Sequence, residues 1–84
     1  MAGPYTLEVP GNDVWLPTWA WGGTALKVTN LDQHNPGKVT VNADSAREDV
    51  LVLAQDSVTI HREWGGIEIE VVNSGGPPMV VETW

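Results

Sequence analysis

Apolar and polar residues alternate with a period of two along most of this chain. Such alternation is typical of β-strands that bury one face, and the β-branched residues Val, Ile and Thr are frequent within the alternating segments. Clusters of Gly, Pro, Asn and Asp separate these segments at intervals of roughly eight to twelve residues, as in small all-β domains. We therefore predict strands over residues 5–9, 14–16, 24–30, 38–43, 49–53, 57–64, 67–73 and 79–84.

The alternation also predicts which side chains face the core, because successive side chains of a strand point to opposite faces. Trp15 lies between Val14 and Leu16 and is interpreted as core filler, since the chain has no phenylalanine. Trp64 has the strand parity of Val58 and Ile60, which places it inward as well. The other side chains predicted to face inward are Tyr5, Leu7, Val9, Leu26, Val28, Val39, Val41 and Ala43.

Two connections carry local signals. Gly65 and Gly66 separate two alternating segments, which predicts a two-residue β-hairpin with positive φ at both glycines. Ser45 and Glu48 have the spacing of a helix capping box, but a strand-like segment follows at once, so residues 44–48 are expected to form at most one helical turn.

The sequence contains a weak internal similarity. Residues 26–30 are followed by a Pro-Gly turn and then by Val39 and Val41. Residues 69–73 are likewise followed by a Gly-Gly-Pro-Pro turn and then by Val80 and Val81. This similarity is compatible with an internal duplication, and equally with an ordinary series of antiparallel strands.

With 84 residues and few helix signals, the chain is expected to form a single all-β domain over residues 1–84. Several antiparallel strands in so short a chain predict a small two-sheet sandwich of about seven or eight short strands. An immunoglobulin-like or a jelly-roll topology fits this description, and the sequence does not determine the order of the strands.

Charge and cysteine content exclude several classes of function. Eleven acidic and four basic residues give a net charge of −7, which argues against nucleic acid and anionic membranes as partners. The absence of cysteine excludes disulfides and thiolate chemistry. No apolar segment approaches the length of a membrane span, so we expect a soluble protein, either cytoplasmic or secreted with its leader absent from this chain.

The segment 14–23 contains three of the five tryptophans. Trp19 and Trp21 follow Pro17, precede Gly22 and Gly23, and have the same parity, so both can project from one side of a loop. Paired indoles can stack on the apolar face of a sugar ring while short polar side chains bind its hydroxyl groups. The polar candidates are Asn12, Asp13, Asp32, Gln33, His34 and Asn35, which are also ordinary turn residues.

Catalytic and metal-binding signals are weak. The two histidines, His34 and His61, have no second ligand at a recognised spacing, and the sequence contains no nucleophile elbow or phosphate-binding loop. We therefore expect no enzyme activity, no cofactor and no metal site.

The sequence thus favours a non-enzymatic, lectin-like module that binds carbohydrate. The alternative is an oligomeric adaptor domain, with another protein as partner and the tryptophans as interface anchors. Apolar residues on both faces of some strands predict a homo-oligomer whose interface contains Leu51, Leu53, Val72 and Val80.

Overall fold

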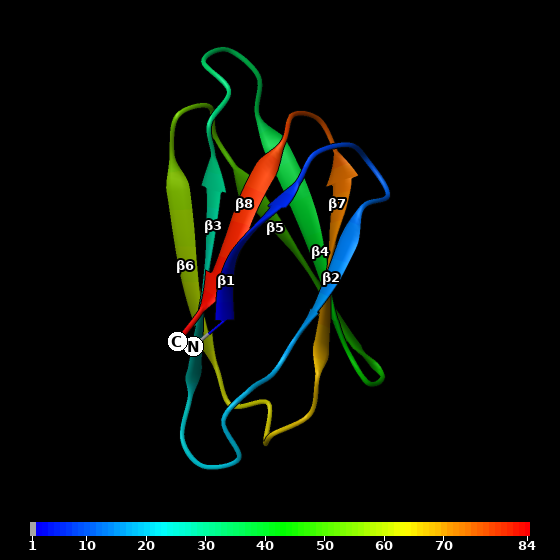
Figure 1. Ribbon diagram of the computed structural model, residues 1–84, viewed down its shortest axis with the longest axis vertical. Helices are drawn as coiled ribbons and strands as arrows, with labels where there is room; N and C mark the ends of the chain where they lie inside the picture. Colours follow the sequence, from blue (N-terminus) through cyan, green and yellow to red (C-terminus); the bar gives the residue numbers. More distant parts are fainter. Residues whose placement is uncertain (1) are drawn as a thin grey trace.

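The computed structural model describes residues 2–84 and shows two four-stranded antiparallel sheets packed face to face (Figure 1). These residues include no helix, and hence none that could cross a membrane. The predicted all-β, two-sheet sandwich is confirmed. The strands are β1 (Ala2–Leu7), β2 (Asp13–Leu16), β3 (Thr24–Asn30), β4 (Gly37–Ala43), β5 (Ala46–Val52), β6 (Ser57–Arg62), β7 (Ile69–Gly75) and β8 (Met79–Thr83).

The strand order determines the topology. Sheet A has the order β1-β8-β3-β6, and sheet B has the order β2-β7-β4-β5. Among the described strands, only β4 and β5 are consecutive in the chain and neighbours in one sheet, so the other connections cross between the sheets. The chain is therefore a long antiparallel ribbon, with β1–β4 running beside β8–β5, wrapped into a sandwich. This is the jelly-roll order, one of the two topologies that fitted the sequence.

An approximate two-fold symmetry relates the two halves of the chain. Exchanging β1–β4 with β5–β8 converts the order of sheet A into β5-β4-β7-β2, which is sheet B read from its other edge. The register of the strands has the same symmetry. Asn30 of β3 pairs with Met79 of β8, and the equivalent Asn73 of β7 pairs with Val39 of β4. Segments 21–30 and 64–73 also both begin with Trp-Gly-Gly and have Val at the third-last and Asn at the last position. Together these features support an internal duplication.

Asn30 and Asn73 are the symmetry-related buried polar residues at the ends of β3 and β7. The Asn73 amide nitrogen donates to the carbonyls of Leu7 (3.0 Å) and Pro77 (3.1 Å), and its side-chain oxygen accepts the Gly75 N–H (3.1 Å). The Asn30 side chain makes the corresponding three bonds, to the carbonyls of Asn35 and Val52 and the N–H of Asp32. Each amide thus bonds to backbone groups of the loop that follows it and to a strand of the opposite sheet, Leu7 of β1 or Val52 of β5.

The core lies between the inner faces of the two sheets. Leu7, Leu26, Val28, Val39, Val41 and Ala43 are buried as predicted, and Trp64 is partly buried against them. Leu16, Val50, Val52, Ile69, Val71, Met79 and Val81 complete the buried cluster.

Three apolar residues predicted to face inward are exposed instead. Tyr5 is 46% exposed, because β1 is the edge strand of sheet A and its register shifts between Ala2 and Tyr5. Val9 is 54% exposed, because β1 ends at Leu7 and Val9 begins a turn closed by the Asn12 N–H. Trp15 is 56% exposed, because Val14 and Leu16 face inward and strand alternation turns the indole outward.

Two predicted connections also differ from the structure. Gly65 and Gly66 have φ of +72° and +87°, as expected, but they do not form a hairpin. They join β6 of sheet A to β7 of sheet B, and the local sequence does not reveal that this connection crosses between the sheets. Residues 44–48 contain no helical turn, because Ala43 pairs with Ala46 around a tight hairpin in which Asp44 has φ of +53°. An aspartate tolerates this left-handed conformation better than most residues do.

Substitution of the two glycines by valine is expected to destabilise the domain unequally. Gly65→Val should lower the free energy of unfolding by more than about 1 kcal/mol, since a β-branched residue resists positive φ. Gly66→Val should lower it further, because a Cβ there would lie 3.2 Å from the Ala20 Cα. Urea unfolding of both variants tests the order, and equal midpoints would contradict the role of the Ala20 contact.

Candidate functional site

The tryptophan-rich loop between β2 and β3 is held by hydrogen bonds from both sides. The Thr18 hydroxyl donates to the Ile67 carbonyl (2.6 Å), and the Trp19 N–H donates to the Thr24 hydroxyl (2.9 Å). Gly66 lies close against Ala20, where a Cβ atom would be 3.2 Å from the Ala20 Cα. The loop therefore has a defined shape before any ligand arrives, which reduces the entropic cost of binding.

Three indoles are exposed at this end of the sandwich: Trp21 (91%), Trp19 (52%) and Trp84 (45%). Trp84 follows β8, and its backbone N–H and carbonyl pair with those of Ala25 (3.0 and 2.9 Å). This pairing places Trp84 opposite the start of β3, where it lines a shallow hollow together with Trp19. The hollow measures about 90 Å³, and its remaining lining residues are Pro17, Thr18, Thr24 and Thr83.

The size and lining of this hollow limit what it can do. Drug-sized ligands and cofactors generally occupy pockets of roughly 300–1,000 Å³, whereas this hollow is about 90 Å³. Within residues 2–84, its lining consists of indole, proline and threonine side chains, none of them charged. Such a surface can hold one face of a small ring, or an apolar side chain of a partner, without enclosing it.

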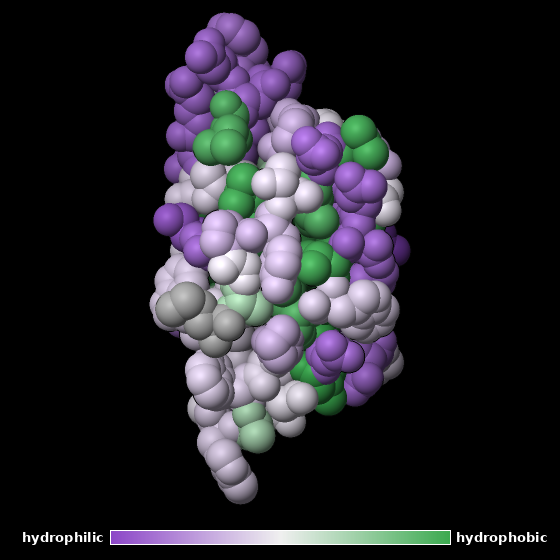
Figure 2. Space-filling view, viewed as in Figure 1, coloured by the Kyte–Doolittle hydropathy of each residue, from purple (hydrophilic) through white to green (hydrophobic). Residues whose placement is uncertain are grey.

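The six polar candidates lie at the opposite end of a molecule that is 38 Å long. In Figure 1 the β3–β4 loop with Asp32, Gln33, His34 and Asn35 is at the top, as are the β1–β2 connection with Asn12 and the start of β2 with Asp13, while the tryptophan loop is at the bottom. Figure 2 shows a strongly hydrophilic top and a bottom of intermediate hydropathy. The structure therefore does not bring these residues together with Trp19 and Trp21.

Two of the six have clear roles in turns. The Asp32 carboxylate accepts the backbone N–H groups of His34 and Asn35 (both 2.8 Å), and these bonds lower the pKa of Asp32 below its ordinary value. The Asn12 side-chain oxygen accepts the N–H groups of Glu8 and Val9 (3.1 and 3.2 Å). These are the local bonds by which Asp and Asn stabilise turns.

The polar groups nearest to the tryptophan loop come instead from β6 and the residue after it. Thr24 pairs with Arg62, so Gly23 lies beside His61, Arg62 and Glu63, which line an open depression. The Arg62 guanidinium is bonded to Glu48 across the two sheets. The sequence could not indicate these residues or Trp84, because their proximity depends on the β3–β6 and β3–β8 pairings.

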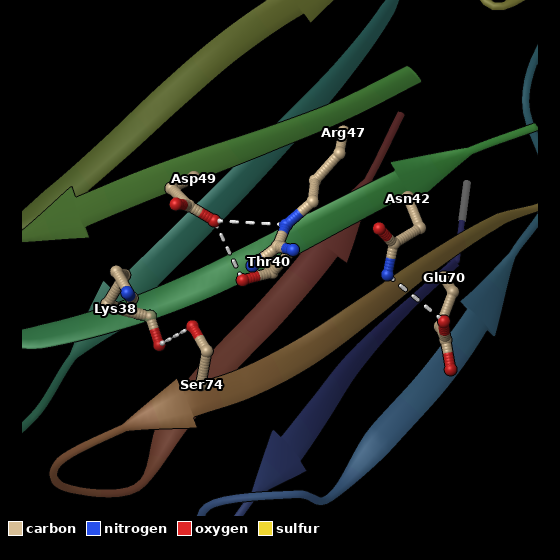
Figure 3. Close-up of polar contacts among 7 residues, drawn as sticks. All are labelled: Lys38, Thr40, Asn42, Arg47, Asp49, Glu70 and Ser74. Atoms are coloured by element: carbon tan, nitrogen blue, oxygen red, sulfur yellow. Dashed lines mark hydrogen bonds and ion pairs between the residues drawn. The ribbon is translucent and has the colours of Figure 1, made fainter. Parts of the chain in front are cut away.

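The outer face of sheet B carries a second ordered arrangement of polar groups (Figure 3). The Asn42 amide donates to Glu70 (3.2 Å), and the Thr40 hydroxyl donates to Asp49 (2.9 Å). A hydrogen bond shared with the Asp13 carboxyl raises the pKa of Glu70, and desolvation adds to this effect. Asp13 therefore belongs to this face and not to the tryptophan loop.

Comparison with known proteins places the chain in a family. The family model DUF8244, described as a family of unknown function, matches residues 5–84. The chain belongs to this family. Two uncharacterised proteins of Dictyostelium discoideum are similar over their whole length, with 34% and 33% identity across 84 residues and 99% of each chain covered. No solved structure matches the chain.

The four apolar residues predicted as an interface in this DUF8244 chain are divided between two faces. Leu51 (63% exposed) and Val72 lie on the outer face of sheet B, and Leu53 (60% exposed) follows β5. Val80 lies on the outer face of sheet A, because Met79 and Val81 face the core. These residues therefore do not form a single patch.

The Asp13–Glu70 pair leads to a prediction of pH dependence. A carboxyl whose pKa is raised in the folded state binds its proton more tightly there, so its contribution to stability decreases as the pH rises through that pKa. Asp13→Asn should therefore lower the pKa of Glu70 and raise the melting temperature at pH 7. Carbon NMR titration of the Glu70 carboxyl measures the shift, and an unchanged Glu70 pKa would refute the pairing.

Proposed function

We propose that this domain is a non-enzymatic carbohydrate-binding module that stacks sugar rings on Trp19, Trp21 and Trp84. The observation that carries the proposal is the exposure of three indoles at one end, two of them on a loop fixed by hydrogen bonds and the third, Trp84, paired beside it. Exposed indoles contribute nothing to the core, and a cluster of them is typical of a binding surface. The shallow hollow between Trp19 and Trp84 suits a ligand that lies on the surface.

The chemistry of a sugar ring complements this surface. The C–H groups on one face of a pyranose are apolar and slightly positive, so they pack on the negative face of an indole. The hydroxyl groups at the ring edge would then reach polar groups beside the loop, of which His61 and Glu63 are exposed. The net charge of −7 favours neutral glycans over sulfated or uronic ones.

A glycan array followed by titration of tryptophan fluorescence tests the proposal. Trp19→Ala and Trp84→Ala should each weaken binding of the best neutral glycan by about tenfold or more, since stacking on an aromatic side chain is worth roughly 1–3 kcal/mol. Leu31→Ala, an exposed apolar residue at the opposite end, serves as the control and should bind normally. An array without any bound glycan would refute the proposal.

A second candidate is an oligomeric interaction domain, favoured by the exposure of Leu51 and Leu53 near one edge of sheet B. In this case the protein should sediment as a dimer or small ring at micromolar concentration. Leu51→Lys should then dissociate it, because a charge in a buried interface without a partner is costly. A parent protein that sediments as a 9.1 kDa monomer would exclude this candidate.

A further inference from the structure

One residue from each strand of sheet B forms a row across its outer face. Trp15 of β2 pairs with Glu70 of β7, Glu70 pairs with Asn42 of β4, and Asn42 pairs with Arg47 of β5. Paired residues on one face of an antiparallel sheet have Cβ atoms roughly 4.5–5.5 Å apart. The row therefore begins with an indole and continues with a carboxylate, an amide and a guanidinium.

The Trp15 indole is not part of the core. Its neighbour Leu16 is fully buried, whereas the Trp15 indole is 56% exposed on the other side of the strand. Trp15 is also separate from the tryptophan loop, because it lies within β2 and lines no part of the hollow beside Trp84.

Asn42 and Glu70 of the row are bonded to each other, and all three polar groups keep unused bonding capacity. Asn42 is fixed by the bond from its amide nitrogen to one Glu70 oxygen (3.2 Å). An amide oxygen and a carboxylate can each accept further bonds. The Arg47 side chain is 68% exposed, and its contact with Asp49 is long at 3.9 Å. In Figure 3 these side chains project from the same face of the sheet.

The length and charge of the row indicate the kind of ligand. Four strands at a spacing of about 4.8 Å span about 14 Å, which is the length of a short oligosaccharide. Protein interfaces are depleted of charged residues at their centre, whereas this face carries Asp13, Glu70, Asp49, Lys38 and Arg47 beside the apolar Leu51 and Val72. The polar groups of this face can bond to the many hydroxyl groups of a glycan, whereas an apolar protein surface would leave them without partners.

We propose that the Trp15–Arg47 row is a second carbohydrate subsite, in which a neutral oligosaccharide lies across the strands of sheet B. One ring stacks on Trp15, and hydroxyl groups along the chain bond to Glu70, Asn42 and Arg47. The proposal rests on the proposed function, because it takes glycans as the ligand class, but it uses no residue of the tryptophan loop.

NMR titration of nitrogen-15-labelled protein tests this subsite with four defined probes. Cellohexaose, laminarihexaose and xylohexaose represent neutral chains of different linkage, and a hyaluronan hexasaccharide represents an acidic chain. At least one neutral probe should shift the Trp15 indole N–H and the Asn42 side-chain amide, and the acidic probe should not. Trp15→Ala and Asn42→Ala should weaken this binding about tenfold or more, while Thr59→Ala on the outer face of sheet A should not change it.

Each result separates the two sites. Shifts confined to Trp19, Trp21 and Trp84 would overturn the second subsite and leave the proposed function intact. Shifts confined to the row would support the subsite and overturn the assignment of the tryptophan loop. The absence of any shift with all four probes would overturn the subsite. If the glycan array also shows no bound glycan, the proposed function is refuted as well. Concentration-dependent shifts of Trp15 without sugar would assign this face to a second copy of the chain and overturn the subsite.

Discussion

Asn73→Ala is expected to be among the most destabilising single substitutions in this domain. The Asn73 side chain is fully buried and makes three hydrogen bonds, to the carbonyls of Leu7 and Pro77 and the N–H of Gly75. Alanine would remove the side-chain partner of all three backbone groups, and a buried polar group that is left unsatisfied costs roughly 1–3 kcal/mol. The loss of about 3 kcal/mol or more is a large part of the total stability of a small domain. Urea unfolding measures it directly.

The matched controls are other asparagines. Asn30→Ala should destabilise as strongly, because Asn30 makes the symmetry-related bonds at the end of β3. Asn42→Ala should have a small effect, since Asn42 lies on the outer face of sheet B and bonds to a partly exposed carboxylate. A melting temperature within a few degrees of the parent for Asn73→Ala would show that water replaces the amide.

The alternation of apolar and polar residues predicted the strands well because the signal is local. Residues 24–30 coincide with β3, and the inward positions Val39 and Val41 of β4 are buried. The pairing of the strands could not be predicted, because nearly every neighbour in both sheets is distant in sequence. The Gly65–Gly66 turn shows the difference, since its backbone conformation was predicted correctly and the strands that it joins were assigned wrongly to one hairpin.

The candidate site was predictable to a similar extent. Trp19 and Trp21 are close in sequence, and their position between a proline and two glycines indicated an exposed loop. Trp84 reaches that loop only through its pairing with Ala25. The polar residues 32–35 were assigned to the same site on residue type alone. They lie at the opposite end of the sandwich from the tryptophan loop, because β3 runs from one end to the other between them. Residue types can therefore indicate that a binding surface exists, whereas the strand topology determines which residues form it.

The internal symmetry provides a strict test of the tryptophan loop. Trp21 and Trp64 each precede two glycines, and the first of these glycines has φ of +74° in one loop and +72° in the other. Trp64 packs against the core, whereas Trp21 is 91% exposed. Since equivalent positions place one indole partly buried against the core and the other in solvent, the exposed indole is not required by the fold.

Trp21→Ala and Trp64→Ala should therefore have opposite effects. Trp21→Ala should change the free energy of unfolding by no more than about 0.5 kcal/mol, as is usual for exposed positions. It should nevertheless weaken glycan binding about tenfold or more, because a stacking surface is lost. Trp64→Ala should lower the free energy of unfolding by about 1–3 kcal/mol, given its partial burial, and leave the affinity of the folded protein unchanged. Urea unfolding and fluorescence titration of both variants separate the two roles. Equal destabilisation by the two substitutions would show that Trp21 is a structural residue and would remove it from the site.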